Sequence, residues 1–345
     1  MTTSTGSKKI LLAPAPRKVA EIFSDKDLAR LRAIGALTIH ESAPFPDDLF
    51  NEIAPDLQMI LGQIDLPESR LRRTGALKAV FNVEGNFLPN IDYDYCFAHK
   101  IRVLNISPVF AEPVAEAALG MAIDLARGIS VSDRHFRRGC EEYGLSANRR
   151  AFSLFRQDVG FIGFGDLAKA ILPLLRPFSC RIRAYDPWLS PELLQTFECE
   201  AASLDDVLRH SRVIFVVAGA TTQNQGFLGA SQFSLMQPDS ALILLSRAAV
   251  VDFDAMLDFA AREAIRVATD VYPQEPLPAA HPARQNENTL LCAHQAGALE
   301  TALKGIGKLV VSDAELIARG LPPLLCKPAQ PETVLSFRSR PVDQT

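Results

Sequence analysis

The stretch DVGFIGFGDLAKAILPLLRPFSCRIRAYDPW, residues 158–188, decides the fold of this chain. A short apolar run precedes a glycine turn, and apolar residues at helical spacing then lead into a second apolar run that ends in Asp186. The pattern predicts a strand, a tight turn, a helix and a second strand. Glycines in such a turn let the backbone approach a pyrophosphate, and the helix N-terminus offers free N–H groups. The stretch therefore predicts a dinucleotide site.

The turn itself supplies four candidate cofactor-binding residues. Gly163 and Gly165 form the turn, and Asp166 and Leu167 begin the helix. Ala168 takes the third small position, which only brings helix and strand close together. Taken alone, the glycines are also compatible with an ordinary turn of an α/β protein. Asp166 puts a carboxylate near the expected pyrophosphate, or it is instead a solvated anion stabilised by the helix dipole.

Asp186 indicates which dinucleotide binds. It follows the second strand, at the position from which an acid accepts hydrogen bonds from ribose hydroxyls. No arginine follows it closely, and its charge would repel the 2′-phosphate of NADP. We therefore expect NAD as the cofactor, at Asp186 and the glycine turn.

Composition limits the class of protein. The chain has 345 residues, enough for two domains, and its net charge of −4 argues against a nucleic-acid partner. The N-terminus is polar and no apolar run approaches the ~20 residues of a membrane span, so we expect neither a signal peptide nor a membrane partner. The six cysteines show no C-x-x-C spacing, which argues against a zinc site or disulfides and favours a cytoplasmic protein. They are Cys96, Cys140, Cys180, Cys199, Cys292 and Cys326.

Short apolar runs predict a first α/β unit with strands at residues 10–13, 59–61, 79–83 and 101–104. Residues 25–34 have a helical pattern, for which Ser24 is the expected N-cap. Residues 112–129 predict a long helix that is apolar around most of its circumference, so we expect it to cross between domains or to pack on a second subunit. The polar, basic residues 130–156 are expected to form an exposed excursion.

After Asp186 the alternation of strands and helices resumes, as in a doubly wound sheet. Strands are expected at residues 212–218, 241–245, 265–269 and 289–292. Helices are expected at residues 207–210, from residue 230, and at 253–261. A final helix is expected at residues 300–321. The proline-rich tail from Pro322 is expected to be loosely held.

Reactive residues follow three of the predicted strands, where open α/β sheets bind ligands. The stretches are SRAAVVD at 246–252, DVYPQEPL at 270–277 and AHQAG at 293–297. They bring an arginine, a carboxylate and a histidine to the dinucleotide edge.

These motifs, the glycine turn and VAE at 114–116 resemble the D-isomer-specific 2-hydroxyacid dehydrogenases, a family that includes phosphoglycerate dehydrogenase, glyoxylate and hydroxypyruvate reductases, and formate dehydrogenase. The resemblance covers roughly residues 79–297. It implies an α/β fold of two Rossmann-like or flavodoxin-like domains with doubly wound parallel sheets. The cofactor domain, 106–296, is expected to be inserted into a substrate domain, 1–105 and 297–330, with a tail at 331–345.

The resemblance also implies a catalytic triad of Arg247, Glu275 and His294. The planar fork of Arg247 suits a substrate carboxylate and can polarise the neighbouring carbonyl. His294 can exchange a proton near neutral pH, and Glu275 would favour the imidazolium and orient the ring.

Further cofactor contacts are implied by the same resemblance, at Ala218, Gly219, Thr222, Ser246, Asp270 and Gly297. Asp270 matches the acid that binds the nicotinamide carboxamide, with a turn cap as the alternative. Ala218 and Ala220 replace the usual histidine and proline, so fewer side chains contact the cofactor here and a loose loop is equally compatible.

The implied substrate loop, residues 83–92, departs most from the family pattern. Gly85 is retained, but Phe87 and Pro89 replace the usual second glycine and aspartate. Gly85 and Asn86 are the candidate substrate-binding residues. Glu84 and Asn86 suit a hydroxylated substrate, and Glu84 would repel a phosphate; alternatively, both are turn residues with solvated side chains.

The sequence therefore predicts an NAD-dependent 2-hydroxyacid dehydrogenase that reduces small 2-oxo acids, without a metal and as a homodimer. The alternative is an NAD(H)-sensing binding protein of the corepressor kind on the same fold. Weak turnover with tight NADH binding would identify the sensor.

Overall fold

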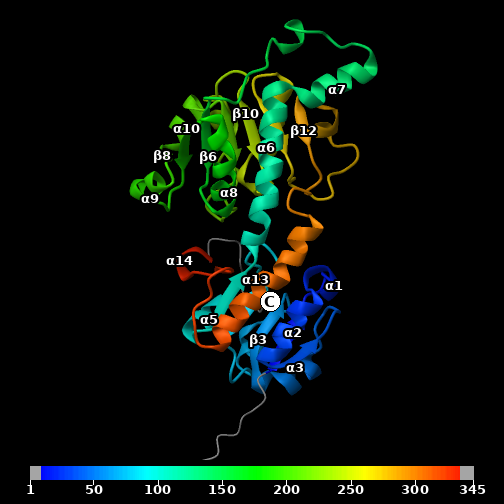
Figure 1. Ribbon diagram of the computed structural model, residues 1–345, viewed down its shortest axis with the longest axis vertical. Helices are drawn as coiled ribbons and strands as arrows, with labels where there is room; N and C mark the ends of the chain where they lie inside the picture. The colour runs from blue at the N-terminus through cyan, green and yellow to red at the C-terminus, as the bar shows by residue number, and fades with distance from the viewer. Residues whose placement is uncertain (1–8, 335–345) are drawn as a thin grey trace, which may run out of the picture. The chain divides into compact units, whose positions relative to one another are not determined.

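The computed structural model describes residues 9–334 of the chain. The chain divides into two compact units: unit 1 comprises Met1–Phe110 and Ala298–Thr345, and unit 2 comprises Ala111–Gly297 (Figure 1). Unit 2 is thus inserted into unit 1, with crossings at 110/111 and 297/298, where the sequence had placed them at 105/106 and 296/297. Each unit is an α/β fold built on a mostly parallel sheet, so the predicted fold class is confirmed.

Unit 2 contains a parallel sheet of seven strands in the order β12-β11-β10-β9-β6-β7-β8. Its strands are β6 (Asp158–Ile162), β7 (Arg181–Tyr185), β8 (Glu200–Ala201), β9 (Val213–Val216), β10 (Ala241–Leu244), β11 (Arg266–Thr269) and β12 (Thr289–Leu291). Its α-helices are α6 (Ala111–Arg127), α7 (Ile129–Arg138), α8 (Asp166–Leu175), α9 (Pro191–Thr196), α10 (Leu204–His210), α11 (Ala230–Phe233) and α12 (Phe253–Ala261). Short 3₁₀ turns are η3 (Ser146–Asn148), η4 (Arg176–Phe178), η5 (Ala248–Val250) and η6 (Pro282–Gln285).

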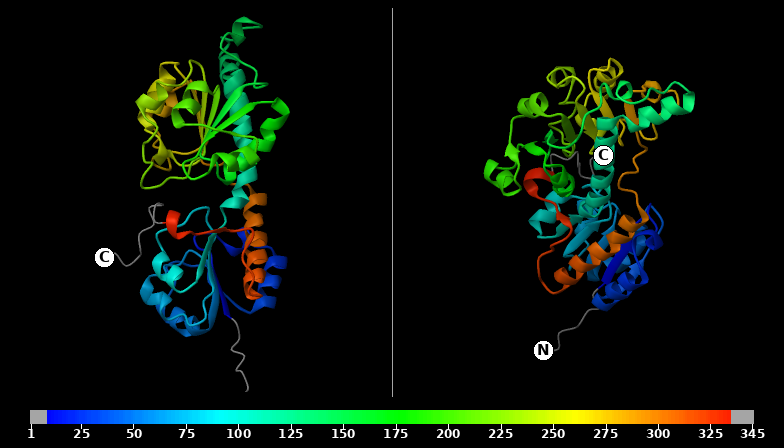
Figure 2. Two further views of the ribbon diagram at one scale, coloured as in Figure 1. Left: turned by 90° about the vertical axis from the view of Figure 1, so that its left-hand side faces the viewer. Right: turned by 45° about the horizontal axis from the view of Figure 1, so that its top comes forward.

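The central strands of this sheet are buried on both faces because helices cover both of them. Every residue of β9 and β10 is buried, which matches their unbroken apolar sequences VIFV and ALIL. The long helix α6 packs on α8, β10 and β11 (Figure 2). Its buried residues recur at helical spacing, including Val114, Ala118, Met121 and Leu125. The order reverses at β6 and β9, so the glycine turn after β6 lies at the topological switch point.

The predicted excursion at residues 130–156 contains a helix that the sequence analysis missed. Helix α7 lies between Gly128 and Gly139, both with positive φ (66° and 68°), and it buries none of its residues. The predicted exposure is confirmed, but the helix itself was not predicted. Arg138 pairs with Glu287 at 2.6 Å, and Arg150 pairs with Asp239, which attaches the segment to unit 2.

Unit 1 contains a sheet of six strands in the order β13-β5-β4-β3-β1-β2. They are β1 (Lys9–Ala13), β2 (Ala36–Ile39), β3 (Leu57–Gly62), β4 (Ala79–Asn82), β5 (Arg102–Asn105) and β13 (Lys327–Pro328), of which only β13 is antiparallel to its neighbour. The helices are α1 (Val19–Ile22), α2 (Asp25–Ile34), α3 (Asp47–Ile53), α4 (Glu68–Leu71), α5 (Tyr93–Ala98), α13 (Glu300–Ala318) and α14 (Pro331–Val334), with η1 (Ala54–Asp56) and η2 (Ser107–Phe110) as 3₁₀ turns. Strand β2 escaped prediction because it is a short edge strand whose residues are only half-buried or exposed.

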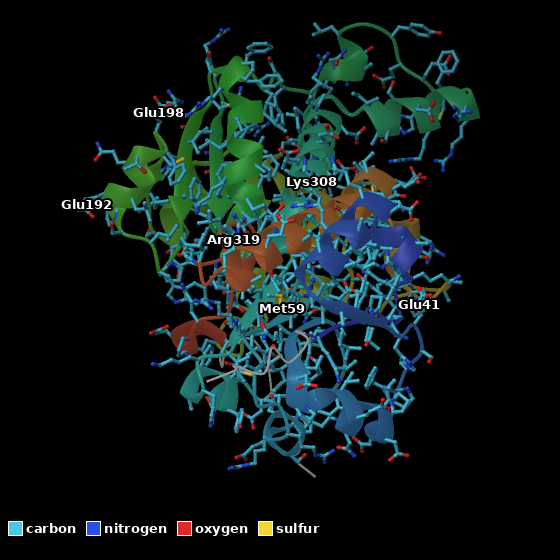
Figure 3. All side chains as sticks on the ribbon, turned by 60° about the horizontal axis from the view of Figure 1, so that its bottom comes forward. Glu41, Met59, Glu192, Glu198, Lys308 and Arg319 are labelled. Atoms are coloured by element: carbon cyan, nitrogen blue, oxygen red, sulfur yellow. The ribbon has the colours of Figure 1, made fainter. Side chains whose placement is uncertain are left out.

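Helices α2 and α13 show how local sequence sets the elements of unit 1. Ser24 caps α2 as predicted, since its hydroxyl accepts the N–H of Asp27 at 3.2 Å. Helix α13 packs against α1 and α2, and its buried residues share one core cluster with residues of β1, β3 and β4. Lys308 of α13 and Arg319, directly after the helix, are exposed (Figure 3).

The tail is held more firmly than the sequence predicted. Buried Asp313 of α13 accepts the backbone N–H groups of Leu324, Leu325 and Cys326 at 2.7–3.2 Å. This places β13 beside β5, and α14 follows with Val334 buried. The expectation of a loose tail is thus wrong for residues 322–334, and the rest of the expected tail lies outside the described residues.

Candidate active site

The glycine turn after β6 has the geometry that a pyrophosphate site needs. Gly163 has φ +87°, and a Cβ there would lie 2.4 Å from the Cα of Ala218, so only glycine fits. Next to it, the ring of Phe164 is buried and anchors the turn. Beside Gly165, which precedes α8, no atom beyond its chain neighbours lies within 4 Å of where a Cβ would be. This open space and the free N–H groups of the first helical turn fit a dinucleotide phosphate.

Half-buried Asp166 and Leu167 form the first turn of α8, where the sequence placed them. Asp186 follows β7, and its Oδ2 accepts the N–H of Phe164 at 2.8 Å. Its Oδ1 accepts the N–H of Trp188 at 3.0 Å. The carboxylate is therefore fixed beside the glycine turn, and each oxygen keeps a lone pair for a ribose hydroxyl.

The loop after β9 is ordered by a residue that the sequence analysis did not single out. Asn224 accepts the N–H of Thr221 at 2.7 Å and donates to the carbonyl of Gly219 at 2.8 Å. These bonds close the loop that contains Ala218, Gly219 and exposed Thr222, so the alternative of a loose loop is not what the structure shows. The signal was available, because asparagine commonly closes turns on its own backbone.

Two further candidate cofactor residues lie at the carboxyl ends of β10 and β11. Ser246 is buried, and among the described residues its hydroxyl has no hydrogen-bond partner, which leaves a polar atom for a ligand. Asp270 is 2% exposed and accepts the N–H groups of Gln295 and Ala296, both at 2.9 Å. Asp270 therefore acts as a turn clamp on the loop from His294 to Gly297, which was the alternative to the nicotinamide contact.

The three predicted catalytic residues converge in unit 2. His294 Nδ1 lies 2.6 Å from Oε2 of Glu275, although the two residues are 19 apart in sequence. Arg247 precedes η5 and donates to the carbonyl of Ser246 at 2.7 Å. His294 has φ +51°, a left-handed conformation that is uncommon outside glycine. The clamp by Asp270 on the two following residues holds this conformation.

The electrostatics of the triad keep Glu275 ionised. Partial burial acts to raise its pKa, but the hydrogen bonds from His294 and from the backbone of Tyr272, with the charges of His294 and Arg247, outweigh it and lower the pKa. Arg247, Glu275 and His294 follow the neighbouring strands β10, β11 and β12, so all three lie at the same edge of the sheet. Tyr272 is a poor proton donor by comparison, because burial, then the acidic groups of Cys292 and Asp270, raise its pKa to about 12.

The predicted substrate loop follows β4 in unit 1. Gly85 is half-buried and Asn86 is exposed, while Phe87 packs edge-on against Tyr93 with ring centroids 6.2 Å apart. Glu84 is not a solvated turn residue, since its carboxylate pairs with Arg17 at 2.8 Å. The sequence analysis missed Arg17, whose position after β1 was the available signal.

No group of metal-binding side chains occurs among residues 9–334, and no helix in that range has the length and apolarity to span a membrane. All six cysteines are free thiols.

Comparison with known proteins agrees with this geometry. The model of the NAD binding domain of the D-isomer specific 2-hydroxyacid dehydrogenases matches residues 119–296. This match bears out the prediction of an NAD-binding unit.

Three similar proteins illustrate the range of relatives. The crystal structure of a phosphoglycerate oxidoreductase from Rhizobium etli is 43% identical and covers 94% of this chain and 99% of that one, with a TM-score of 0.85. The D-3-phosphoglycerate dehydrogenase of Archaeoglobus fulgidus is 23% identical over 88% of this chain, which spans only 57% of that relative. The glyoxylate reductase of Thermococcus kodakarensis is 28% identical over 68% of this chain and 72% of the relative.

Proposed function

Because the chain belongs to the D-isomer-specific 2-hydroxyacid dehydrogenases, we propose that it is an NAD-dependent enzyme that reduces a small 2-oxo acid to the 2-hydroxy acid. The observation that carries this proposal is the contact between His294 and Glu275 at 2.6 Å, with Arg247 nearby. An imidazole, a carboxylate and a guanidinium are the groups that protonate and orient a 2-oxo acid.

When bound, NADH would supply the hydride for the 2-oxo carbon, and the residues of the glycine turn and Asp186 would hold it. The glycine turn holds the pyrophosphate through Gly163, Gly165 and the start of α8, and Asp186 accepts hydrogen bonds from the ribose. The position of Asp186 favours NADH over NADPH by at least about tenfold, because a misplaced like charge in a partly desolvated site costs ~1–3 kcal/mol.

His294 donates the proton. Its Nδ1 is bonded to Glu275, which leaves Nε2 to protonate the oxygen of the 2-oxo group. Glu275 stays ionised because its pKa is lowered, so it stabilises the imidazolium before transfer. Arg247 binds the substrate carboxylate with its planar fork and polarises the adjacent carbonyl. Gly85 and Asn86 are the proposed substrate-binding residues of unit 1.

The remaining cofactor assignments are also proposals. Ala218, Gly219 and Thr222 border the adenine and ribose, whereas Ser246 and Gly297 lie by the nicotinamide end. For Ser246 the support is its buried hydroxyl without a partner among the described residues. Asp270 already accepts two backbone N–H groups, so we propose that the nicotinamide carboxamide donates to the remaining lone pairs of its carboxylate.

The test is NADH oxidation by the purified chain with a panel of short 2-oxo acids. We expect turnover of at least about 1 s⁻¹ with the best acid, as for ordinary enzymes. We also expect a lower kcat/KM with NADPH than with NADH. The NAD(H)-sensing alternative predicts tight NADH binding with almost no turnover on every acid. Equal kcat/KM with both cofactors would show that Asp186 does not select NADH.

We further propose that the protein is a cytoplasmic homodimer formed through unit 2. Large apolar side chains are exposed along the segment that follows α6: Ile129, Phe136, Tyr143, Leu145 and Phe155 are 50–86% exposed. A second copy of the same segment would cover them across a two-fold axis.

A further inference from the structure

The carboxyl edge of the unit 1 sheet carries a row of polar side chains. Arg17 follows β1, Gln63 follows β3, Asn82 ends β4 before Glu84, and Asn105 ends β5. These four strands are parallel neighbours in the order β5-β4-β3-β1, so their carboxyl ends meet at one edge. The predicted substrate loop starts in this row.

Two polar atoms of this row are left without partners. Asn82 is fully buried, and its Nδ2 has no hydrogen-bond partner among the described residues; the same holds for the buried Oε1 of Gln63. Buried amide groups are normally satisfied by protein, water or a ligand. This edge therefore offers uncharged donors and acceptors to a bound molecule.

Glu84 is fixed at this edge from three sides. Its N–H donates to Asn82 Oδ1 at 2.9 Å, and its carbonyl accepts the N–H of Ile106 at 3.3 Å. Its carboxylate accepts from both Nε and Nη2 of Arg17, each at 2.8 Å. The two side chains are 23% and 28% exposed, so the pair still reaches solvent. The result is a rigid, neutral pair of opposite charges beside Gly85.

The pairing decides what the edge can bind. A guanidinium fork is the usual protein ligand for a phosphate or carboxylate, but here Glu84 already occupies that fork. A phosphate could take this fork only by displacing Glu84, which would leave a carboxylate uncompensated beside a dianion. At the remaining N–H groups of Arg17 a phosphate would still be repelled by the charge of Glu84. A hydroxyl needs no displacement, because it donates to the free lone pairs of Glu84 and accepts from the remaining N–H groups of Arg17.

We infer that the Arg17–Glu84 pair is a specificity device that selects short 2-oxo acids whose other polar groups are hydroxyls and rejects those with a phosphate or a second carboxylate. The inference rests on the proposed reduction of 2-oxo acids and names the substrate class of that reaction. Sites built to bond a hydroxyl discriminate strongly, since a wrong group leaves buried polar atoms unpaired.

The experiment compares hydroxypyruvate with phosphohydroxypyruvate, which differ only by the phosphate, in NADH-dependent reduction. We expect the wild-type chain to favour hydroxypyruvate at least tenfold in kcat/KM. Glu84→Gln frees the guanidinium while keeping the size of the side chain, so it should move the ratio at least tenfold toward the phosphorylated acid. Arg17→Gln leaves Glu84 unpaired and should move the ratio the other way.

A matched control is available in the same unit. Arg30 and Glu315 form another two-bond pair at 2.9 Å, with 30% and 32% exposure, between α2 and α13. Glu315→Gln therefore removes the same chemistry away from the strand ends, and it should leave the ratio unchanged. The inference would be overturned if the ratio of kcat/KM for the two acids in Glu84→Gln lay within twofold of the ratio in Glu315→Gln. A wild-type preference for the phosphorylated acid would also overturn it.

Binding measurements separate this inference from the proposed function. Calorimetric titration of the wild-type chain with D-glycerate and with 3-phosphoglycerate, in the presence of NAD, needs no turnover. If no acid is reduced yet glycerate binds at least tenfold more tightly and Glu84→Gln reverses the order, the proposed activity fails and the inference stands. If acids are reduced but neither ratio responds to Glu84→Gln, the inference alone fails.

Discussion

At the scale of single residues, one loop of unit 2 concentrates the chemistry. His294 has a positive φ, its ring contacts Glu275, and its two successors donate their N–H groups to Asp270. A residue other than glycine in the left-handed conformation costs about 1 kcal/mol or more, and this conformation persists only where neighbouring groups hold it. The buried clamp by Asp270 and the ionised Glu275 together set the orientation of the imidazole.

Replacement of His294 tests its role as proton donor. His294→Ala should lower kcat for 2-oxo acid reduction by ~10²–10⁴-fold, because general acid catalysis contributes about that much. NADH affinity should change little, and Trp188 reports it by fluorescence, as it is the one tryptophan of the chain and lies next to the Asp186 turn. Arg247→Ala should instead raise KM as well, since it removes the carboxylate clamp. Near wild-type turnover of His294→Ala would refute the triad.

Replacement of Glu275 tests the electrostatic pairing through the pH profile. The pKa of Glu275 is lowered, so its charge is present from acid to alkaline pH and is lost only as pH falls below the ordinary glutamate range. Because that charge supports reduction, kcat/KM of the wild type should fall on the acid side as Glu275 takes up a proton. Glu275→Gln carries no charge at any pH, so its kcat/KM should be lower than that of the wild type at neutral pH and should lack this acid-side fall.

Glu287→Gln is the matched control, since Glu287 lies in the same unit but pairs with Arg138. Its pH profile of kcat/KM should coincide with that of the wild type. An acid-side fall that persists in Glu275→Gln would mean that a group other than Glu275 is responsible for it.

At the scale of elements, a single buried carboxylate attaches the end of unit 1 to its sheet. Asp313 on α13 is fully buried and binds three successive N–H groups, and the chain then enters β13 and α14. Three charge-assisted hydrogen bonds offset the cost of burying the charge. The antiparallel edge strand β13 depends on this contact as well as on its pairing with β5.

Removal of this carboxylate should loosen the segment and destabilise unit 1. Asp313→Ala leaves three buried N–H groups without an acceptor, and we expect a loss of about 2–4 kcal/mol in the free energy of unfolding by urea. Hydrogen exchange at the amides of residues 324–326 should accelerate most. Asp313→Asn, which keeps one acceptor oxygen, should fall in between. The control is Asp65→Ala, because Asp65 is exposed. If Asp65→Ala lowers the free energy of unfolding as much as Asp313→Ala does, the hydrogen bonds to Asp313 are not the cause of the loss.

At the scale of the whole molecule, the two units follow one principle. Both sheets place polar residues directly after the carboxyl ends of parallel strands, with Arg17 and Glu84 in unit 1, and Arg247 and Glu275 in unit 2. Exposed large apolar side chains occur in both units, but in unit 2 several of them follow one another along α7 and the residues after it. This run is the surface through which we propose self-association.

Substitution on α6 tests the proposed dimer. Gly120 is exposed, and nothing lies within 4 Å of where its Cβ would be, so Gly120→Arg fits within one protomer. If a second copy packs on this face, the added charge and bulk should convert a dimeric mass in light scattering to a monomeric one at micromolar concentration. Leu321→Arg, at an exposed leucine of unit 1, should leave the mass unchanged. A monomeric wild type would contradict the proposal.

The sequence alone determined whatever depends on local spacing. Most strands and helices of unit 2 were predicted to within a few residues, because buried strands have unbroken apolar runs and α12 has regular helical periodicity. The exceptions are α7, α9 and β8, which were not predicted. The glycine turn was predicted because Gly163 and Gly165 serve a geometry that few other residues allow. The ordered motifs carried the resemblance to the family, and that resemblance implied the proposed triad; the residues follow the strands β10, β11 and β12, whose carboxyl ends lie at one edge of the sheet.

Only the tertiary structure decided the contacts that depend on strand order and long-range packing. Arg17 and Glu84 are 67 residues apart, and only the sheet order places their strands at the same edge, which turns a free acid into a neutral pair. Asp313 binds backbone N–H groups of residues after Pro322, because a buried carboxylate is stable only when it accepts hydrogen bonds. The local sequence around Asp313 does not indicate which residues supply these donors. Local sequence patterns predict strands and helices because neighbouring residues share one periodicity. Contacts between residues distant in sequence depend on the strand order and on the need to pair buried charges with hydrogen-bond partners.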